Sequence, residues 1–532
     1  MGTHWLDWEV VEIEASKALP AERSSRGLTA PTRGDILTGL GVALVLIPQA
    51  LANAEIAGLP PVAGLYAAAL PPVAAALFAS SRYLQTGPVA MTALLTFGAL
   101  SVLSEPGTLE YVQLAILLAL VVGVTRIAFG LIGAGLVAYL MSQPVLLGFT
   151  SAAAILIIAS QIPTALGVEP TSAGLLSGAF DAIVSLDEWQ AVHITIAVVT
   201  GLIIFYGRRI HPLFPGVLVA VALALAASVF FGFTGETVGA IPRGLPRPTL
   251  DLPWSSLPYL LLPGAVIALV GFAEAVAISR TYAAQDREPW DPNREFISQG
   301  VANVVSAASG GFPVGGSFSR TSLAKLSGAR TRWAGAIAGL LVLAFLPVAD
   351  VLAALPRATL AGIVIVAIAP LVRMPTLVRL IRVTWGQSVV AWGTFVATLA
   401  LSPRIDIAVT IGIALATLVH LRRESLIEIE TERWNEALIL RPSGVLYFGS
   451  APRLSEALLD QLADHGEAVE RVIVDLSRLG RVDYTGAVAL KSFSEDCTRA
   501  GLDFELRAVP KHAEGTLERY WGTELAQIWK SE

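Results

Sequence analysis

The chain has 532 residues, of which 54% are hydrophobic and only 15% are charged, and its net charge is -6. Soluble domains carry roughly 25% charged residues, so the composition excludes an ordinary soluble globular protein. A single cysteine, Cys497, excludes a disulfide framework and an iron–sulfur cluster within one chain, and the lack of a basic tract argues against a nucleic-acid partner.

The charged residues are distributed unevenly along the chain. Residues 35–420 hold 35 of them in 386 positions, whereas the other 146 positions hold 43. This split predicts a cytosolic amphipathic segment at 1–33, a transmembrane domain at 34–423 and a soluble domain at 433–532. The histidines are isolated in sequence and no Gly-rich phosphate loop is present, so we expect neither a metal nor a cofactor.

The apolar stretches predict how often the chain crosses the membrane. Thirteen charge-free stretches of at least 15 residues lie between residues 36 and 421, and a shorter element, SLAKLSGA, follows Arg320. About 20 apolar residues span a bilayer, so we predict fourteen segments, two of them incomplete helices. With both ends in the cytoplasm, thirteen Lys and Arg residues, Arg126 among them, lie in inner loops and four in outer loops, as the positive-inside rule requires.

Two charged residues fall within predicted membrane segments. Glu274 lies in AVIALVGFAEAVAIS and Arg320 in GGSFSRTSLA. A charge at membrane depth costs about 2.5 to 3.5 kcal/mol on insertion scales and therefore suggests a functional site. The alternative is a structural role, in which each side chain reaches water from a helix end or the two residues pair with each other.

Two stretches predict short helices that begin inside the membrane. They are QTGPVAMTALL, with Thr86, Gly87 and Pro88, and GGFPVGGSFSRTSLA. The free N–H groups and positive dipole end of such a helix suit an anion, although an ordinary capped helix in a loop is the alternative.

The spacing of these stretches favours the first interpretation. Pro88 follows Gln49 by 39 residues and Phe318 follows Glu274 by 44, so each half of seven segments contains a membrane helix followed by a half-helix. Because seven is odd, the second half must be inverted, which is the arrangement that marks a transport site at the membrane midplane.

The C-terminal tail has the pattern of a small α/β domain. EALILRPSGVLYFGS predicts a hairpin around Pro442, Ser443 and Gly444. SEALLDQLADHGE and GAVALKSFSEDCTRAG predict amphipathic helices on either side of a buried strand, RVIVDLSRL.

These motifs resemble the SulP family of anion transporters, called solute carrier family 26 in animals, over nearly the whole chain. The similar stretches are GDILTGLGVALVLIPQALANAEIAGLPPVAGLYAAALPP, ASSRYLQTGPVA and EFISQGVANVVSAASGGFPVGGSFSRTSLAKLSGARTRWAG. VIVDLSRLGRVDYTGAVAL is similar to the strand, turn and helix of a STAS domain. The resemblance implies a mostly α membrane protein of seven plus seven inverted segments, with core and gate domains, a homodimer and a cytosolic α/β STAS domain.

The resemblance also implies a substrate site on segment 1 and at the starts of segments 3 and 10. The residues at the matching positions are Gln49, Asn53, Val89, Ala90, Ser317, Phe318, Ser319 and Arg320. Glu274 matches the segment 8 acidic residue that is associated with cation coupling in prokaryotic members.

Two positions depart from the family pattern. Asn53 is polar where some relatives have an aromatic residue, so the size of the pocket cannot be copied from them. Tyr484 stands where regulatory STAS proteins carry a phosphorylatable serine, so the resemblance does not imply that form of control here.

The predicted function is secondary active transport of a small anion, such as sulfate, bicarbonate or a dicarboxylate like fumarate, coupled to protons or sodium. We expect an integral protein of the bacterial inner membrane, with the N-terminus and STAS domain in the cytoplasm, and no enzymatic activity, because no catalytic constellation is present. The alternatives are a nucleobase permease of the same fold and a regulatory membrane protein that acts through its STAS domain.

Overall fold

The computed structural model describes residues 30–135, 141–172, 174–211, 214–246, 251–465 and 469–529. Most of the predicted N-terminal segment 1–33 lies outside these ranges. The described residues divide into two units. The first holds most of the helices as far as residue 373, and the second holds the last apolar helices together with the C-terminal α/β domain.

The first half of the first unit is helical except for one short strand. Its elements are α1 (Arg33–Ile56), α2 (Pro61–Phe78), β1 (Gln85–Gly87), α3 (Ala90–Leu100), α4 (Leu109–Leu131), α5 (Gln143–Leu166), α6 (Leu175–Val184), α7 (Ala191–Ile210) and α8 (Gly216–Phe231).

The second half repeats this order, with a strand again placed before a short helix. Its elements are α9 (Leu257–Asp286), α10 (Pro292–Ala308), β2 (Gly315–Ser317), α11 (Phe318–Leu326), α12 (Trp333–Phe345) and α13 (Arg357–Ile368).

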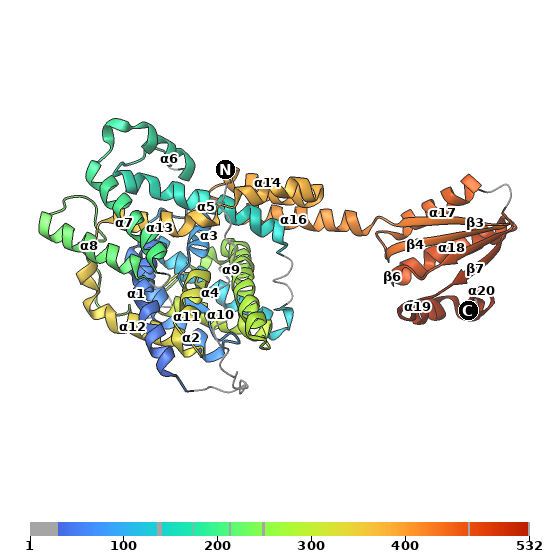
Figure 1. Cartoon of the computed structure of the whole chain (residues 1–532), viewed down its shortest axis with the longest axis horizontal. Coiled ribbons are helices and arrows are strands. Elements are labelled where there is room, and N and C mark those ends of the chain that lie inside the picture. Colours follow the sequence, from blue (N-terminus) through green and yellow to red (C-terminus); the bar gives the residue numbers. More distant parts are fainter. Residues whose placement is uncertain are drawn as a thin grey trace. The chain divides into compact units, whose positions relative to one another are not determined.

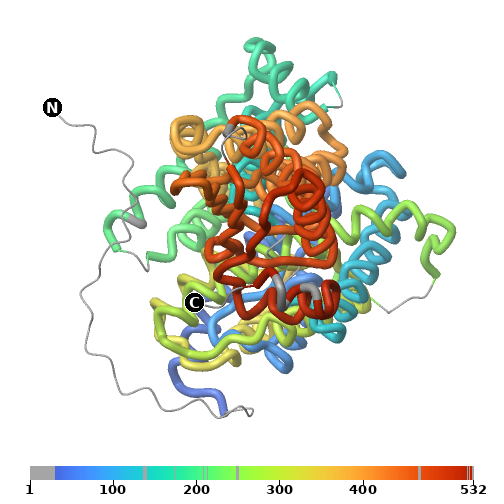
Figure 2. Tube along the Cα trace, turned by 90° about the vertical axis from the view of Figure 1, so that its right-hand side faces the viewer, coloured from blue at the N-terminus to red at the C-terminus, as the bar shows by residue number. Residues whose placement is uncertain are grey.

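The helices of the two halves interleave. Helix α1 packs on α2 and α12, and α10 packs on α2 and α4. The blue and cyan helices of the first half accordingly lie among the green and yellow helices of the second in both views (Figures 1 and 2). Small residues allow the close approach of α4 and α10: a Cβ on Gly123 would lie 2.8 Å from the Val304 backbone nitrogen, and one on Gly300 2.8 Å from that of Ile127.

Length and composition identify eight described helices that could cross a membrane. They are Arg33–Ile56, Pro61–Phe78, Leu109–Leu131, Gln143–Leu166, Trp254–Asp286, Trp333–Leu352, Arg357–Val383 and Ile405–Glu424. Shorter apolar helices, including α3, α7 and α8, accompany them. The mostly helical membrane fold is thus confirmed, whereas the count of fourteen segments stays a prediction.

The predicted topology can be tested by cysteine labelling. Leu245→Cys, in the loop after α8, is expected to react with an impermeant maleimide in intact cells, because this loop is predicted to lie outside. The native Cys497 is buried in the C-terminal domain, and burial raises the pKa of its thiol to about 12, so it gives little background. Arg330→Cys, at an exposed position predicted to face the cytoplasm, is the control. Labelling of position 245 only after permeabilisation would contradict the topology.

The second unit contains the end of the membrane region and the α/β domain. The elements after residue 373, of which only residues 398–409 belong to the first unit, are α14 (Met374–Val383), α15 (Trp385–Ala400), α16 (Ile405–Glu424), β3 (Glu428–Trp434), β4 (Ala437–Leu446), α17 (Ala451–His465), β5 (Arg471–Asp475), β6 (Leu479–Val482), α18 (Tyr484–Arg499), β7 (Asp503–Arg507), α19 (Lys511–Trp521) and α20 (Leu525–Ile528).

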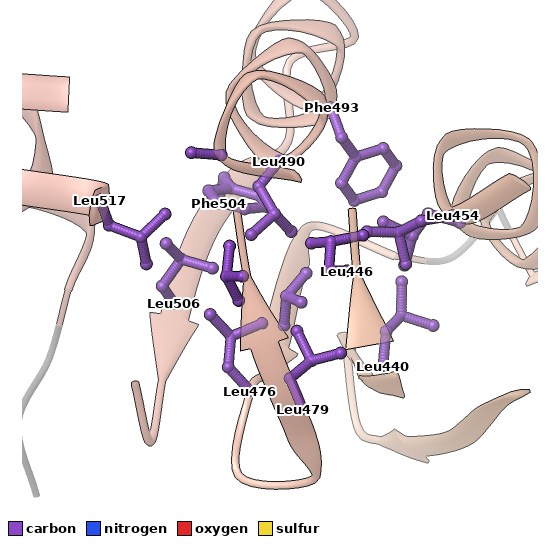
Figure 3. Close-up of a cluster of buried hydrophobic side chains, with 14 of the residues drawn as sticks. Leu440, Leu446, Leu454, Leu476, Leu479, Leu490, Phe493, Phe504, Leu506 and Leu517 are labelled. Carbon is purple, nitrogen blue, oxygen red and sulfur yellow. The ribbon is translucent and has the colours of Figure 1, made fainter. Parts of the chain in front are cut away.

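The α/β domain is a five-stranded sheet covered by helices. The strand order is β3-β4-β5-β7, with β6 also paired to β4, and all pairs are parallel except β3 with β4. Leucine and phenylalanine side chains from the strands and from α17, α18 and α19 form one buried core (Figure 3). Tyr484 begins α18 and is exposed, after Asp483, whose side chain caps the helix.

The hairpin predicted around Pro442, Ser443 and Gly444 is wrong. Strand β4 runs through these residues, and the turn lies earlier, between Trp434 and Ala437. The Pro-Ser-Gly sequence instead lies where β4 changes partners: residues 437–440 pair with β5, whereas Gly444 and Leu446 pair with β6, with an irregularity between these two positions. A glycine inside a strand often marks such a bulge.

Candidate functional site

The two short strands bring the starts of the two short helices together. Strands β1 and β2 pair antiparallel, with Gln85 opposite Ser317 and Gly87 opposite Gly315. Helices α3 and α11 therefore continue from opposite ends of one ladder, as an inverted repeat requires. The Thr321 hydroxyl strengthens the junction, because it accepts the Gln85 N–H at 3.0 Å and donates to the Ser317 carbonyl at 2.6 Å.

The Arg320 side chain connects three elements at this junction. It is 2% exposed, and its Nη1 donates to the Pro88 carbonyl at 3.0 Å and to Gln49 Oε1, on α1, at 3.3 Å. Asn53, one turn further along α1, donates its Nδ2 to the same Pro88 carbonyl at 3.1 Å. Four residues from α1, the start of α3 and α11 thus form one hydrogen-bonded network.

Part of the Arg320 guanidinium has no protein partner. Its Nε and Nη2 form no hydrogen bond with the described residues, although both atoms are buried. Nη2 lies beside Gly87, where a Cβ would approach it to 3.3 Å and where φ is +153°. Glycine at this position therefore leaves room for the guanidinium at the entrance to α3.

The position of this charge is unusual for a helix. Arg320 lies in the first turn of α11 and contacts the start of α3, so it adds positive charge where two helix dipoles are already positive. Helix N-termini favour negative groups instead. The α3 start has no side-chain cap at Val89. The junction therefore concentrates positive potential, which only a negative group can offset.

The remaining predicted residues surround the junction. Val89 is buried as the residue before α3, and Ala90 is half-buried. The Ser317 hydroxyl caps α11 by accepting the Arg320 N–H at 3.4 Å, and it lies 3.4 Å from the Ser319 hydroxyl. Ser319 and Phe318 are exposed.

Glu274 lies on α9 beside strand β2. A Cβ on Gly316 would come within 3.2 Å of Ala275 Cβ, so glycine permits this close contact between strand and helix. Glu274 is half-buried, and the positive charge of Arg320 acts on it, although the two form no salt bridge within 4.0 Å in the described residues. The structure therefore brings the predicted acid near the network without joining the two directly.

Helix α10 supports the junction, and sequence analysis missed this contribution. Gln299 donates its Nε2 to the Thr86 hydroxyl at 2.7 Å. Asn303 holds the backbone of Val314, just before β2, by accepting its N–H at 2.9 Å and donating to its carbonyl at 3.0 Å. The available signal was the pair of amide side chains, Gln299 and Asn303, one turn apart in a predicted membrane segment.

Arg126 was predicted to lie in an inner loop, and this prediction is wrong. It lies inside α4 and is fully buried. Its guanidinium donates to three backbone carbonyls, those of Ile267 and Ala268 on α9 and that of Val314. Helix α4 continues through this position because these carbonyls replace water as the partners of the charge.

A cavity of about 600 Å³ lies elsewhere, at the C-terminal end of α1. Glu55 and Arg357 line it and form a salt bridge of 3.3 Å, and Arg357 also pairs with Glu236 at 3.1 Å. None of the predicted site residues lines this cavity. The lining residue Glu55 and the neighbouring Glu236 both pair with its arginine and offset the positive charge, so we do not assign the anion site to it.

The fold and this junction define a helical membrane protein of the transporter class, with two half-helix starts that face each other. The Sulfate permease family matches residues 32–394, and the STAS domain matches residues 428–528. The chain therefore belongs to the sulfate permease family, a family of anion transporters, as the resemblance predicted.

Relatives align over most of this chain. A protein of Mycobacterium tuberculosis described as "Probable sulfate transporter MT1781" is 32% identical over 503 residues, which cover 90% of this chain and 89% of that protein. "Probable sulfate transporter 4.2" of Arabidopsis thaliana is 29% identical over 528 residues, 92% of this chain and 78% of that protein.

Solved structures share the fold. The murine Solute Carrier 26 family member A9 anion transporter, in its inward-facing state, superposes with a TM-score of 0.87 at 20% identity, over 97% of this chain and 95% of that one. The transmembrane domain of the cyanobacterium bicarbonate transporter BicA gives 0.61 at 25% identity, over 72% of this chain and 96% of that domain.

Proposed function

We propose that the protein carries a small anion across the membrane by secondary active transport, with the anion bound at the junction of α3 and α11. The observation that carries this proposal is Arg320, a buried arginine in the first turn of α11 with two unpartnered donor atoms. Sulfate is the first candidate, because the relatives named above are described as probable sulfate transporters; bicarbonate and a dicarboxylate such as fumarate are the others.

The anion would be held by groups that replace its hydration shell. The uncapped backbone N–H groups at the start of α3, the hydroxyls of Ser317 and Ser319 and the free donors of Arg320 supply charge-assisted hydrogen bonds. Gln49 and Asn53 orient the Arg320 side chain and the Pro88 carbonyl. These contacts move with the core helices as the site becomes open to one side of the membrane and then to the other.

Glu274 would couple transport to a cation. A deprotonated Glu274 beside the site repels a second negative charge, and a bound proton or sodium ion removes this repulsion. The membrane protein would be a homodimer in the bacterial inner membrane, with the N-terminus and the STAS domain in the cytoplasm. The STAS domain would regulate transport without touching the anion.

Purified protein in liposomes tests the proposal. Uptake of labelled sulfate, bicarbonate and fumarate is measured with an imposed proton gradient, an imposed sodium gradient or neither. We expect saturable uptake of at least one anion and its accumulation under one of the two gradients. Absence of uptake of all three anions, by protein that elutes as a single folded species, would contradict the proposal.

Ser319→Ala is expected to weaken anion binding. The change removes one hydroxyl donor from the start of α11, and a hydrogen bond to a charged group contributes about 1.5 to 3 kcal/mol, or roughly 10- to 150-fold in affinity. The half-saturation concentration of exchange and the Kd from anion titration are the measurements. Ser322→Ala, in the middle of the same helix, is the control and should match the wild type. Wild-type affinity in Ser319→Ala would remove this serine from the site.

A further inference from the structure

Arg126 carries a full charge in the interior of the membrane unit with no acidic partner among the described residues. It is 0% exposed, and each of its hydrogen-bond acceptors is a backbone carbonyl. Nε bonds Ala268 at 3.1 Å, Nη2 bonds Ile267 at 3.2 Å and Nη1 bonds Val314 at 2.9 Å. A guanidinium has the rigid planar fork of donors that such a three-carbonyl contact requires.

The three acceptors belong to the two elements that carry the proposed chemistry. Ile267 and Ala268 lie about two turns before Glu274 on α9. Val314 directly precedes β2, and β2 ends at Ser317, the residue before α11. Arg126 therefore links the helix of the acid to the strand of the anion site, from a third helix, α4.

The surroundings hold this link in place. The Asn303 side chain, on α10, also holds the backbone of Val314: it accepts a hydrogen bond from the Val314 N–H and donates one to the Val314 carbonyl. On α9, Gly271 provides the space for the guanidinium: a Cβ there would lie 2.5 Å from Arg126 Nη2 and 3.1 Å from Thr92 Cγ2 of α3. Helices α3, α4 and α9 and strand β2 thus meet around one guanidinium.

We propose that Arg126 is a positioning residue for coupling. It fixes the separation between Glu274 and the start of α11, so that a charge change at Glu274 alters the field at the anion site by a defined amount. Arg320 is the charged group among the described residues whose field acts on Glu274, and it lies on the α11 side of the link. Loss of the link lets α9 and β2 shift relative to each other. The bound anion then responds less to the state of Glu274, although the anion ligands themselves remain.

The test compares two activities of the same proteoliposomes. This inference rests on the proposed function. The readout is the ratio of gradient-driven accumulation to anion exchange, which is independent of the amount of active protein. Arg126→Gln is expected to keep exchange within about 3-fold of the wild type and to lower the ratio at least about 10-fold. Arg126→Lys keeps the charge but loses the fork, and we expect a similarly low ratio. Arg332 lies away from the junction and donates a hydrogen bond of 2.6 Å to the Ala79 carbonyl. It provides the matched controls Arg332→Gln and Arg332→Lys, and both are expected to keep the wild-type ratio.

Each outcome has a distinct meaning. A wild-type ratio in both Arg126 variants, or an equal loss of exchange and accumulation, would overturn the positioning role. Recovery by Lys but not by Gln would assign Arg126 a purely electrostatic effect and would also overturn it. If neither variant yields folded protein, Gly271→Ala displaces the fork while it retains Arg126, and it must lower the ratio. Absence of all transport by the wild type would instead refute the proposed function.

Discussion

Glu274→Gln is expected to keep anion exchange and to lose the accumulation of anion that an acidic exterior drives. Glutamine has the shape of protonated glutamic acid but cannot release a proton, so the site holds one charge state throughout the cycle. Anion binding persists because the repulsion between a carboxylate and the anion is removed permanently. The measurement is the steady-state ratio of internal to external anion at an imposed pH gradient, with exchange measured in parallel.

The control and the alternative coupling ion sharpen this test. Glu288→Gln makes the same change just beyond α9, where Glu288 forms a salt bridge of 2.7 Å with Arg82, and it should accumulate anion like the wild type. If sodium is the coupling ion, wild-type uptake follows sodium at constant pH, and Glu274→Gln loses this dependence. Full gradient-driven accumulation by Glu274→Gln under both gradients would contradict both versions and leave Glu274 with a structural role.

The location of the junction could be predicted from the sequence, because close backbone contacts and helix starts restrict which residue types can occupy a position. Gly87 and Gly316 occur where a guanidinium or a neighbouring helix approaches the backbone, and Ser317 occurs where a helix needs a cap. Such requirements are local, so residue types along a short stretch record them. An inverted repeat relates the two stretches, but the sequence analysis did not predict the paired strands β1 and β2.

The partners of the two buried arginines could not be predicted in the same way. Arg126 bonds carbonyls that lie 141 to 188 residues away, and a backbone carbonyl has no residue-type signature. Arg126 separates two charge-free stretches, so the count of loop charges treated it as water-facing and placed it in a loop. The same reasoning explains the wrong hairpin in the STAS domain: Gly444 was taken as a turn, whereas the choice of strand partner depends on β5 and β6, which come later in the chain.

Arg320→Ala is expected to abolish measurable anion affinity, with a larger loss than any other single change at the junction. It removes the positive charge, the two free donor atoms and the bonds to Gln49 and the Pro88 carbonyl. The change also leaves the Pro88 carbonyl bonded to Asn53 alone. One charge-assisted hydrogen bond contributes about 1.5 to 3 kcal/mol, so the loss of two such bonds to the anion lowers affinity roughly 100-fold or more.

Arg320→Lys separates charge from geometry, since lysine keeps the positive potential but presents a single donor group. If Arg320 binds the anion through Nε and Nη2, the lysine variant should lose affinity nearly as strongly as the alanine variant. If Arg320 acts through its long-range potential, lysine should recover much of the affinity. The unpartnered state of both atoms favours the first outcome. Exchange kinetics and anion titration of both variants give the comparison, with the exposed Arg330→Ala as the control for a simple change in charge. Wild-type affinity in Arg320→Ala would exclude the junction as the anion site, because no other described group there supplies a positive charge that the two helix starts share.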